Sequence, residues 1–389
     1  MKFKYVVKEL IRLCTENCLK LLWVKPVNSK KILFISFNGQ YSDCPKYMYL
    51  DLREKLGEDY TYAWVIKPEI EDSTLKNIVR IKPNSFRVLK EIATSHIIIT
   101  NNYLNSYVPV REGQFVLNTW HGGSPLKRVG MVNSDVSKEE RLFFKVHEKK
   151  YSAYIASSDF MAEEVIRKSF GYSGEIIRCG LPRNAVLFQE HDALVQKVRQ
   201  YYKLPQNEEI GLALYAPTFR GDHRAGTFLD GEKQFDIDKC IEALEKKFNK
   251  HFYFLFRAHH TFQYSFENSN YLPATDYPDM QELMCAADVM ITDYSSCMGD
   301  MCLMNKPVFL YTPDLNSYIA ERGFYWDIYS LPFPVAKQPE ELYQQIEDFN
   351  QEMYCVKVKE YLDRLGSYED SNSVEIANAR ILKELEGGA

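Results

Sequence analysis

The sequence lacks three features that would place it in a familiar class of protein. No stretch approaches the roughly 18 consecutive apolar residues of a membrane span. Positive charge is not in excess: 48 lysines and arginines stand against 53 aspartates and glutamates, which disfavours a protein dedicated to nucleic acid. No segment repeats at a fixed period, so a solenoid or a propeller is not expected.

Cysteine spacing excludes further classes. The nine cysteines contain no Cys-x-x-Cys pair. Cys14 with Cys18, and Cys297 with Cys302, lie close in sequence, but neither pair is joined by a second pair or by histidines at zinc spacing. The cysteines are therefore expected to be free thiols in a reducing cytoplasm, and no metal site is predicted.

Several well-known site motifs are missing as well. There is no G-x-x-x-x-G-K-[ST] loop and no G-x-G-x-x-G, so neither a P-loop nor a classical dinucleotide fold is indicated. No Asp-x-Asp follows a predicted strand, as a metal-held sugar nucleotide would favour, and no G-x-S-x-G indicates an esterase. We therefore expect no bound cofactor.

Residues 1–26 predict an amphipathic helix on a membrane surface. Apolar residues such as Val7, Leu10 and Leu21 recur at three- and four-residue steps, beside a basic face that stands out in an acidic protein. Trp23 lies near the end, at the place of an interfacial aromatic residue. Charged residues interrupt the apolar run and no cleavage site follows, so a signal peptide is not expected. The alternative is a helix packed on the domain core with a solvated basic side.

After Pro26 apolar strands alternate with helical stretches, which predicts an α/β protein with mostly parallel sheets. The length of 389 residues and a hydrophobic content of 46% suit two or three domains with sizeable cores. A charged helical segment joins two series of strands, and one long charged helix is expected at about 339–385. The predicted strands are 31–36, 61–66, 96–100, 115–120 and 154–158, then 210–218, 252–260, 288–296 and 306–311.

These patterns divide the chain into a helix at 1–26, a first Rossmann-like domain at 27–195 and a second at 205–389. Polar residues follow many of the strands. In doubly wound sheets, ligands bind beyond the carboxyl ends of the strands. We therefore expect a cleft between the two domains, lined by the motifs described next.

The first motif, at 119–127, places His121 directly after a strand and before Gly122 and Gly123. Histidine ordinarily titrates near pH 6.5 and can accept a proton at neutral pH. Glycine lets the backbone approach a ligand closely. Lys127 would attract an anionic group. The alternative is an ordinary polar loop histidine.

The second motif contains Arg257, His259 and His260 after an apolar strand. Such residues suit the oxygens of a phosphate or diphosphate. A zinc site is the alternative, and it is disfavoured because adjacent histidines diverge and no carboxylate pattern lies nearby.

In the third motif, a strand runs into Asp293, Ser295 and Ser296, and Asp300 follows in a predicted helix. Hydroxyl groups together with the N–H groups of a helix N-terminus make an anion site. The alternative is a plain helix cap.

With these motifs in this order, the chain resembles the CDP-glycerol glycerophosphotransferase family of teichoic acid synthesis. The resemblance extends over most of residues 30–330. Its pieces are 36–39 with 41–43 and 45–46, 119–122, 180–184, 215–220, Arg257 with His259, 292–296 with Asp300, and 322–325.

The resemblance implies a GT-B-like fold, in which two Rossmann-like domains face a cleft, and no catalytic metal. It implies transfer of glycerol phosphate from CDP-glycerol to a lipid-linked saccharide acceptor, with release of CMP, by an enzyme bound peripherally at the cytoplasmic face of the cell membrane. The first domain would then bind the acceptor and the second the CDP-alcohol.

The same resemblance implies residue roles. His121 corresponds to the proposed base, His259 to the diphosphate site, and both are expected to be catalytic. Donor phosphate contacts are expected from Arg257, Ser295, Ser296 and Arg220. The other site candidates are Asn38, Gly122, Gly123, Lys127, Arg183, Asn184, Thr218, Asp293, Asp300 and Arg322.

Three departures from the family pattern bear on the substrate. Gly123 and Ser124 occupy one extra position before Pro125, Ala185 replaces the usual aspartate, and His260 follows His259. The alternatives are therefore a CDP-ribitol ribitolphosphotransferase or a capsular polysaccharide glycerophosphotransferase. More distant alternatives are a nucleotide-sugar glycosyltransferase and a non-catalytic membrane-surface protein that retains the fold.

Overall fold

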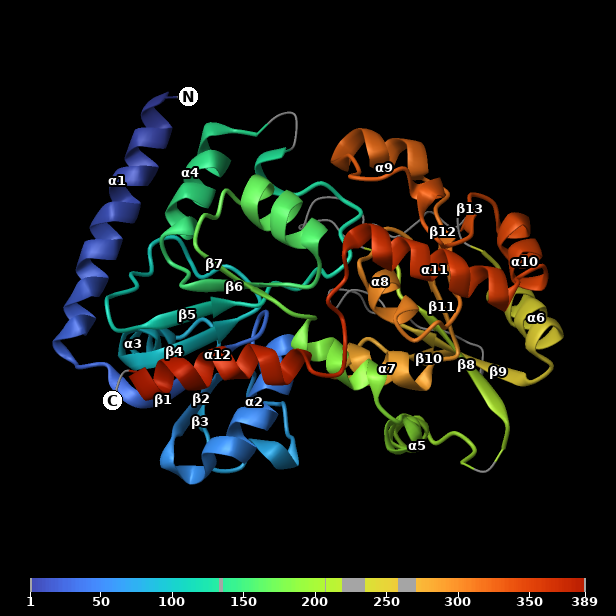
Figure 1. The fold of residues 1–389 in the computed structure, drawn as a ribbon, viewed down its shortest axis with the longest axis horizontal. Coiled ribbons are helices and arrows are strands. Elements are labelled where there is room, and N and C mark those ends of the chain that lie inside the picture. The colour runs from blue at the N-terminus through green and yellow to red at the C-terminus, as the bar shows by residue number, and fades with distance from the viewer. Residues whose placement is uncertain (1, 133–135, 207, 219–234, 258–270, 388–389) are drawn as a thin grey trace. The chain divides into compact units, whose positions relative to one another are not determined.

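The structure is a computed structural model that describes residues 2–132, 136–206, 208–218, 235–257 and 271–387 (Figure 1). The chain forms two compact units. Unit 1 contains Met1–His121, Val129–Ala185 and Ser367–Ala389, and unit 2 contains Gly122–Arg128 and Val186–Gly366.

Unit 1 is built on a seven-stranded sheet in the order β3-β2-β1-β4-β5-β6-β7. All its strand pairs are parallel; Leu33 of β1, for example, is paired with Ala63 on one side and Ile98 on the other. The central β4 is buried along its whole length, which explains its continuous apolar run. The strands are β1 Asn28–Ile35, β2 Thr61–Val65, β3 Val79–Ile81, β4 Ser95–Thr100, β5 Phe115–Asn118, β6 Ala153–Ala156 and β7 Glu175–Arg178.

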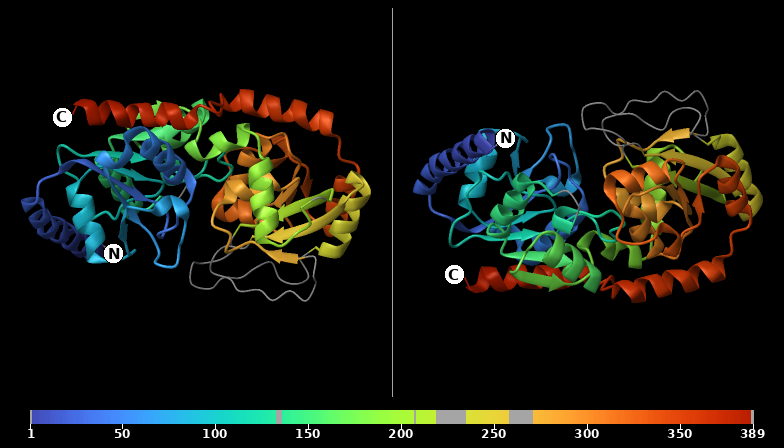
Figure 2. Two further views of the ribbon diagram at one scale, coloured as in Figure 1. Left: turned by 90° about the horizontal axis from the view of Figure 1, so that it is seen from below. Right: turned by 90° about the horizontal axis from the view of Figure 1, so that it is seen from above.

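Helices cover both faces of this sheet, and Figure 2 shows α1 and α12 on opposite sides of it. The helices are α1 Lys2–Leu19, α2 Asp43–Leu56, α3 Phe86–Thr94, α4 Lys138–Glu148 and α12 Ser373–Gly387, with a further helical segment at Met161–Ser169. Among the described residues, no helix has both the length and the apolar content needed to cross a bilayer.

Unit 2 is built on a six-stranded parallel sheet in the order β10-β9-β8-β11-β12-β13. Its strands are β8 Ile210–Tyr215, β9 His251–Phe256, β10 Tyr271–Pro273, β11 Val289–Thr292, β12 Val308–Tyr311 and β13 Val335–Ala336. Its helices are α5 Asp192–Tyr201, α6 Ile237–Phe248, α7 Met280–Ala286, α8 Cys297–Cys302, α9 Leu315–Arg322, α10 Pro339–Glu347 and α11 Gln351–Leu365.

The predicted α/β class, with two doubly wound parallel sheets, is confirmed. The strands that the sequence did not predict are the short outer strands β3, β7, β10 and β13, which are partly exposed and so lack a continuous apolar run. The prediction of a common cleft between the domains stays a prediction.

The predicted single helix at about 339–385 is wrong, because this stretch contains α10, α11 and α12. Asn350 caps α11 by accepting a hydrogen bond from the Met353 N–H. Gly366 ends α11 in the left-handed conformation, with φ of 63°. The break lets the last helix join unit 1, whereas the sequence placed all of 205–389 in one domain.

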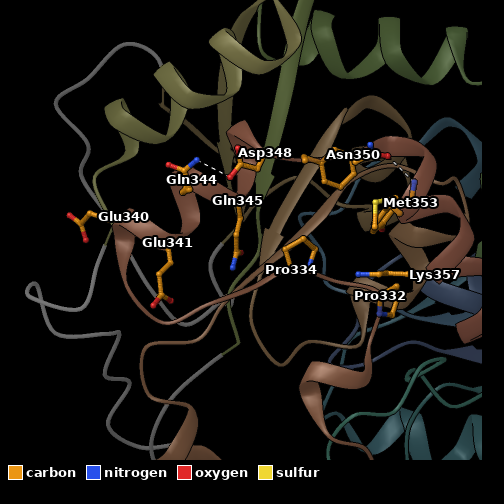
Figure 3. A pocket seen from close by; sticks show the side chains of 12 residues that line it. Pro332, Pro334, Glu340, Glu341, Gln344, Gln345, Asp348, Asn350, Met353 and Lys357 are labelled. Carbon is orange, nitrogen blue, oxygen red and sulfur yellow. Dashed lines mark hydrogen bonds between the residues drawn. The ribbon is translucent and has the colours of Figure 1, made fainter.

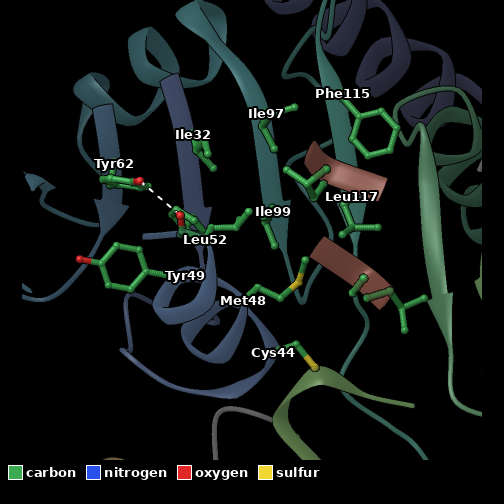
Figure 4. Packing of buried hydrophobic residues seen from close by; sticks show 14 of the residues in the cluster. Ile32, Cys44, Met48, Tyr49, Leu52, Tyr62, Ile97, Ile99, Phe115 and Leu117 are labelled. Atoms are coloured by element: carbon green, nitrogen blue, oxygen red, sulfur yellow. Dashed lines mark hydrogen bonds between the residues drawn. The ribbon is translucent and has the colours of Figure 1, made fainter. Parts of the chain in front are cut away.

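The return of α12 is explained by the core of unit 1. Ala377, Ile381 and Leu385 are buried in one cluster with residues of α2 and the central strands. Figure 4 shows Met48 and Leu52 of α2 in this cluster with strand residues such as Ile97 and Ile99. The buried Asn378 side chain donates hydrogen bonds to the Met48 carbonyl at 3.0 Å and to the Asp51 carboxylate at 2.8 Å.

Ile381→Ala should lower the free energy of unfolding of unit 1 by about 2–5 kcal/mol, because it leaves a cavity in a packed core. Ile376→Ala is the matched control, since Ile376 lies on the same helix with 43% of its surface exposed. Urea unfolding followed by tryptophan fluorescence measures both, because Trp64 lies in the same cluster. Equal effects of the two changes would contradict the packing role of α12.

Candidate active site

His121 follows β5 after a sharp turn of the chain. Trp120 has φ of 55°, in the left-handed region, and directs the next residue away from the strand. The Nδ1 atom of His121 lies 2.9 Å from the backbone carbonyl oxygen of Asn101. A carbonyl oxygen can only accept a hydrogen bond, so Nδ1 carries the hydrogen, and in the neutral ring Nε2 carries the lone pair.

Asn101 is a residue that the sequence did not identify, and it holds the surroundings of His121 together. It is fully buried and follows β4 directly. Its side-chain oxygen accepts a hydrogen bond from the Phe37 N–H at 2.9 Å, and its amide nitrogen donates to the Ser36 hydroxyl at 3.3 Å. The ends of β1, β4 and β5 are thereby joined. The only signal in the sequence was an asparagine at the end of an apolar strand.

Asn38 lies in the turn after β1 and is exposed. The turn is closed by Gly39, whose N–H donates to the Ser36 carbonyl at 3.0 Å and whose φ of 86° requires glycine. Phe37 lies in the same turn and contacts the His121 ring, with ring centroids 5.5 Å apart.

Arg183 forms a buried ion pair with Asp43, whose two carboxylate oxygens lie 3.1 and 3.2 Å from Nη1 of Arg183. The next residue, Asn184, donates a hydrogen bond to the Glu369 carboxylate at 3.0 Å. Both predicted site residues thus have structural partners inside unit 1. Asp43 has φ of 61° at the start of α2, a strained position that the buried ion pair stabilises.

In unit 2, Asp293 joins the ends of β8 and β11. Its carboxylate oxygens both lie 2.9 Å from the backbone nitrogen of Thr218 and accept its hydrogen bond. Asp300 is also buried, and Gln281 donates a hydrogen bond to it at 3.3 Å. Asp293 and Asp300 thus have hydrogen-bond partners within unit 2, and Asp293 holds the loop after β8 in place.

Ser295 and Ser296 are half-buried and lie directly before α8, as the sequence predicted. Their hydroxyl groups therefore lie at the carboxyl end of β11, where doubly wound sheets bind ligands. This placement suits the predicted phosphate contact.

Arg257 follows β9, and its Nη1 donates hydrogen bonds to the carbonyls of Ala274 at 2.8 Å and Tyr277 at 2.7 Å. Burial lowers the pKa of its guanidinium from the ordinary value. One end of the side chain thus supports the loop before α7, and its contact with donor phosphate stays a prediction. His259, His260 and Arg220 lie outside the described residues.

Gly122, Gly123 and Lys127 belong to a segment, Gly122–Arg128, that is part of unit 2. Lys127 pairs with Phe324 in an antiparallel bridge. Arg322 ends α9 and forms an ion pair with its neighbour Glu321 at 3.2 Å.

Within the parts of the chain that the structure describes, no group of three or more His, Cys, Asp or Glu side chains is arranged to hold a metal ion. A pocket of about 670 Å³ lies around α10 and the start of α11 (Figure 3). Residues such as Glu340, Gln345 and Met353 line it, and none of the predicted site residues that the structure describes is among its lining residues.

Two doubly wound parallel sheets with polar residues after their strands define a GT-B-like α/β protein. The solved wall teichoic acid polymerase TagF has the same fold, with a TM-score of 0.79 and 26% identity over 99% of this chain and 97% of that one. The chain belongs to the CDP-glycerol:poly(glycerophosphate) glycerophosphotransferase family, whose family model matches residues 18–383.

Curated relatives carry related names. The teichoic acid poly(glycerol phosphate) polymerase of Staphylococcus epidermidis is 28% identical over 92% of this chain and 51% of its own length. The teichoic acid glycerol-phosphate primase of Bacillus subtilis is 28% identical over 91% of both chains. The chain spans about half the length of the first polymerases that it matches.

Proposed function

We propose that this protein transfers glycerol phosphate from CDP-glycerol to a hydroxyl group of a membrane lipid-linked teichoic acid acceptor and releases CMP. Membership of the glycerophosphotransferase family supports the reaction class. The observation that carries the proposal is the hydrogen bond from Nδ1 of His121 to the Asn101 carbonyl, which makes Nε2 the proton-accepting atom of the neutral ring.

In the proposed reaction, the acceptor hydroxyl attacks the β-phosphorus of CDP-glycerol in line. Nε2 of His121 takes the hydroxyl proton, a new O–P bond forms, and the bond between the β-phosphorus and the CMP oxygen breaks. Negative charge develops on the phosphoryl oxygens and on CMP. Ser295, Ser296 and His259 would stabilise it by hydrogen bonds, so catalysis rests on positioning and electrostatics.

A ribitol donor is the second candidate. The teichoic acid ribitol-phosphate primase of Bacillus spizizenii is 27% identical over 94% of both chains, so the resemblance does not separate the two alcohols. An assay of CMP release from CDP-glycerol and CDP-ribitol, with a lipid-disaccharide analogue as acceptor, tests the function and decides the donor. UDP-GlcNAc in the same screen tests the glycosyltransferase alternative.

The surface of α1 supports peripheral attachment to the membrane. Val7, Leu10 and Ile11 are exposed at 37, 55 and 61% of their surface. At 100° per residue they lie along one stripe of the helix, and Cys14 and Cys18 are exposed in the same stripe.

The opposite side of α1 is polar and lies toward the rest of unit 1. Arg12 forms ion pairs with Glu9 and Glu16, both at 2.6 Å, and donates a hydrogen bond to the Ser106 carbonyl at 3.4 Å. An apolar stripe that points away from the core suits insertion among lipid acyl chains better than packing on the protein.

His121→Ala should lower the rate of CMP release by about 10²–10⁴-fold, the usual contribution of a positioned general base. Donor affinity, measured by calorimetry, should stay nearly unchanged, since the proposed phosphate contacts lie in unit 2. His251→Ala is the control, because His251 is half-exposed and pairs with Glu245. Turnover at the level of the unchanged protein would end the assignment of His121 as the base.

The double change Ser295→Ala with Ser296→Ala should weaken donor binding about tenfold or more and slow turnover as well. It removes hydrogen bonds to a charged diphosphate that exist before and during the reaction. Ser317→Ala on α9 is the control. Unchanged CDP-glycerol affinity in calorimetry would mean that the diphosphate binds elsewhere.

The double change Leu10→Glu with Ile11→Glu should abolish co-sedimentation with anionic vesicles, because it places charge in the stripe that meets the acyl boundary. Met353→Glu with Val356→Glu is the matched control, since these α11 residues are 59 and 58% exposed. Binding of the unchanged protein should fall with salt. Both variants should keep the melting temperature, and vesicle binding retained by the α1 variant would contradict the anchor.

A further inference from the structure

The segment Gly122–Arg128 directly follows His121 in the chain, yet it packs within unit 2. Its far end is fixed by backbone hydrogen bonds to the residues after α9. The Arg128 N–H donates to the Gly323 carbonyl at 3.1 Å, and the Tyr325 N–H donates to the Leu126 carbonyl at 2.9 Å. The Leu126 side chain is buried.

The near end of this segment rests on Gly299 of α8. A Cβ atom added at Gly299 would lie 2.0 Å from Oγ and 2.2 Å from Cβ of Ser124. Because the Cβ of Ser124 does not move when its side chain rotates, no rotamer relieves this overlap. The buried Ser124 can therefore lie this close to α8 because residue 299 has no side chain.

Nothing else in α8 requires a glycine at this position. Gly299 is not among the glycines with positive φ, so its backbone conformation is open to any residue. Glycine inside a helix costs about 0.5–1 kcal/mol relative to alanine. The contact with Ser124 is the physical reason for glycine here.

α8 is also the helix that begins directly after Ser295 and Ser296. Covalent geometry keeps the Cα atoms of His121 and Ser124 within about 11 Å, since only three peptide units join them. α8, which follows Ser295 and Ser296, is therefore in contact with Ser124, three residues after His121.

We propose that Gly299 is a positioning residue for His121: by seating Ser124 on α8, it fixes the backbone that follows the histidine with respect to the donor-binding serines. This inference rests on the proposed function. Gly123 and Ser124 occupy one extra position relative to the usual family motif, and this inference gives Ser124 a role.

A methyl group at position 299 should displace the segment rather than α8. Met298, Asp300, Met301 and Cys302 of α8 are all buried, and α8 packs against β11 and β12. Apart from one bridge at Lys127, the segment belongs to no helix or strand. The displacement would therefore reach the backbone next to His121 and leave the two serines in place.

The test is a set of paired substitutions. Gly299→Ala should lower kcat for CMP release about tenfold or more, because small misplacements of reacting groups cost up to about 100-fold. CDP-glycerol affinity should change by less than about twofold. Adding Ser124→Gly should restore kcat, because the nearest remaining atom, the Cα of residue 124, lies 3.6 Å from the new Cβ, an ordinary contact.

Ser124→Ala provides the matched control, because it removes the hydroxyl group but keeps the Cβ at 2.2 Å. Gly299→Ala with Ser124→Ala should therefore stay as slow as Gly299→Ala alone. Ser124→Gly and Ser124→Ala by themselves set the reference rates. Equal rescue by both changes at Ser124, or unchanged kcat in Gly299→Ala, would overturn the proposal.

Two further readouts separate positioning from other roles. A parallel loss of kcat and donor affinity in Gly299→Ala would mean that the residue supports the serines, and would overturn the role toward His121. If the unchanged protein releases no CMP from any CDP-alcohol, the proposed function falls and the positioning role falls with it. Melting temperatures of Gly299→Ala, of the two single changes at Ser124 and of the two double variants test the contact itself without reference to activity. Ser124→Gly, but not Ser124→Ala, should restore the melting temperature that Gly299→Ala lowers.

Discussion

The parallel pairing of the strands is the constraint on which the rest of this structure depends. Parallel strands in register end at the same edge of a sheet, so the residues that follow them become neighbours although they are far apart in the chain. In unit 1, this brings the turn after β1, Asn101 after β4 and His121 after β5 together. In unit 2, the same pairing brings Thr218 and Asp293 into contact.

Several of the polar residues that follow the strands have structural partners within the protein. Asp293, Arg183 and Arg257 donate or accept hydrogen bonds within the protein and hold loops in place. A buried charge needs such partners, because desolvation without compensation is costly. His121 and the serines before α8 are half-buried and follow β5 and β11, and doubly wound sheets bind ligands at such strand ends.

The two units are joined by more than a single linker. Gly122–Arg128 leaves unit 1 and packs in unit 2, and Ser367–Ala389 returns from unit 2 to the core of unit 1. Each crossing is stabilised by burial: Leu126 in one case, and Ala377, Ile381 and Leu385 in the other. Domain boundaries drawn as single points along the sequence do not describe such a chain.

The sequence by itself determined the fold class, the longer strands and the family. Apolar runs such as 96–100 are long enough to identify a buried strand, and the ordered motifs are specific when taken together. The outer strands and the break before α12 were not predicted, because partly exposed strands and local turn conformations leave weak patterns.

Only the tertiary structure decided which distant residues the candidate residues contact. Asn101 contacts Phe37, 64 positions away, and Asp293 contacts Thr218, 75 positions away. Ser124 lies against Gly299, 175 positions away. A sequence pattern records which residue types follow a strand, whereas a hydrogen bond or a close contact depends on which distant residue the fold places opposite.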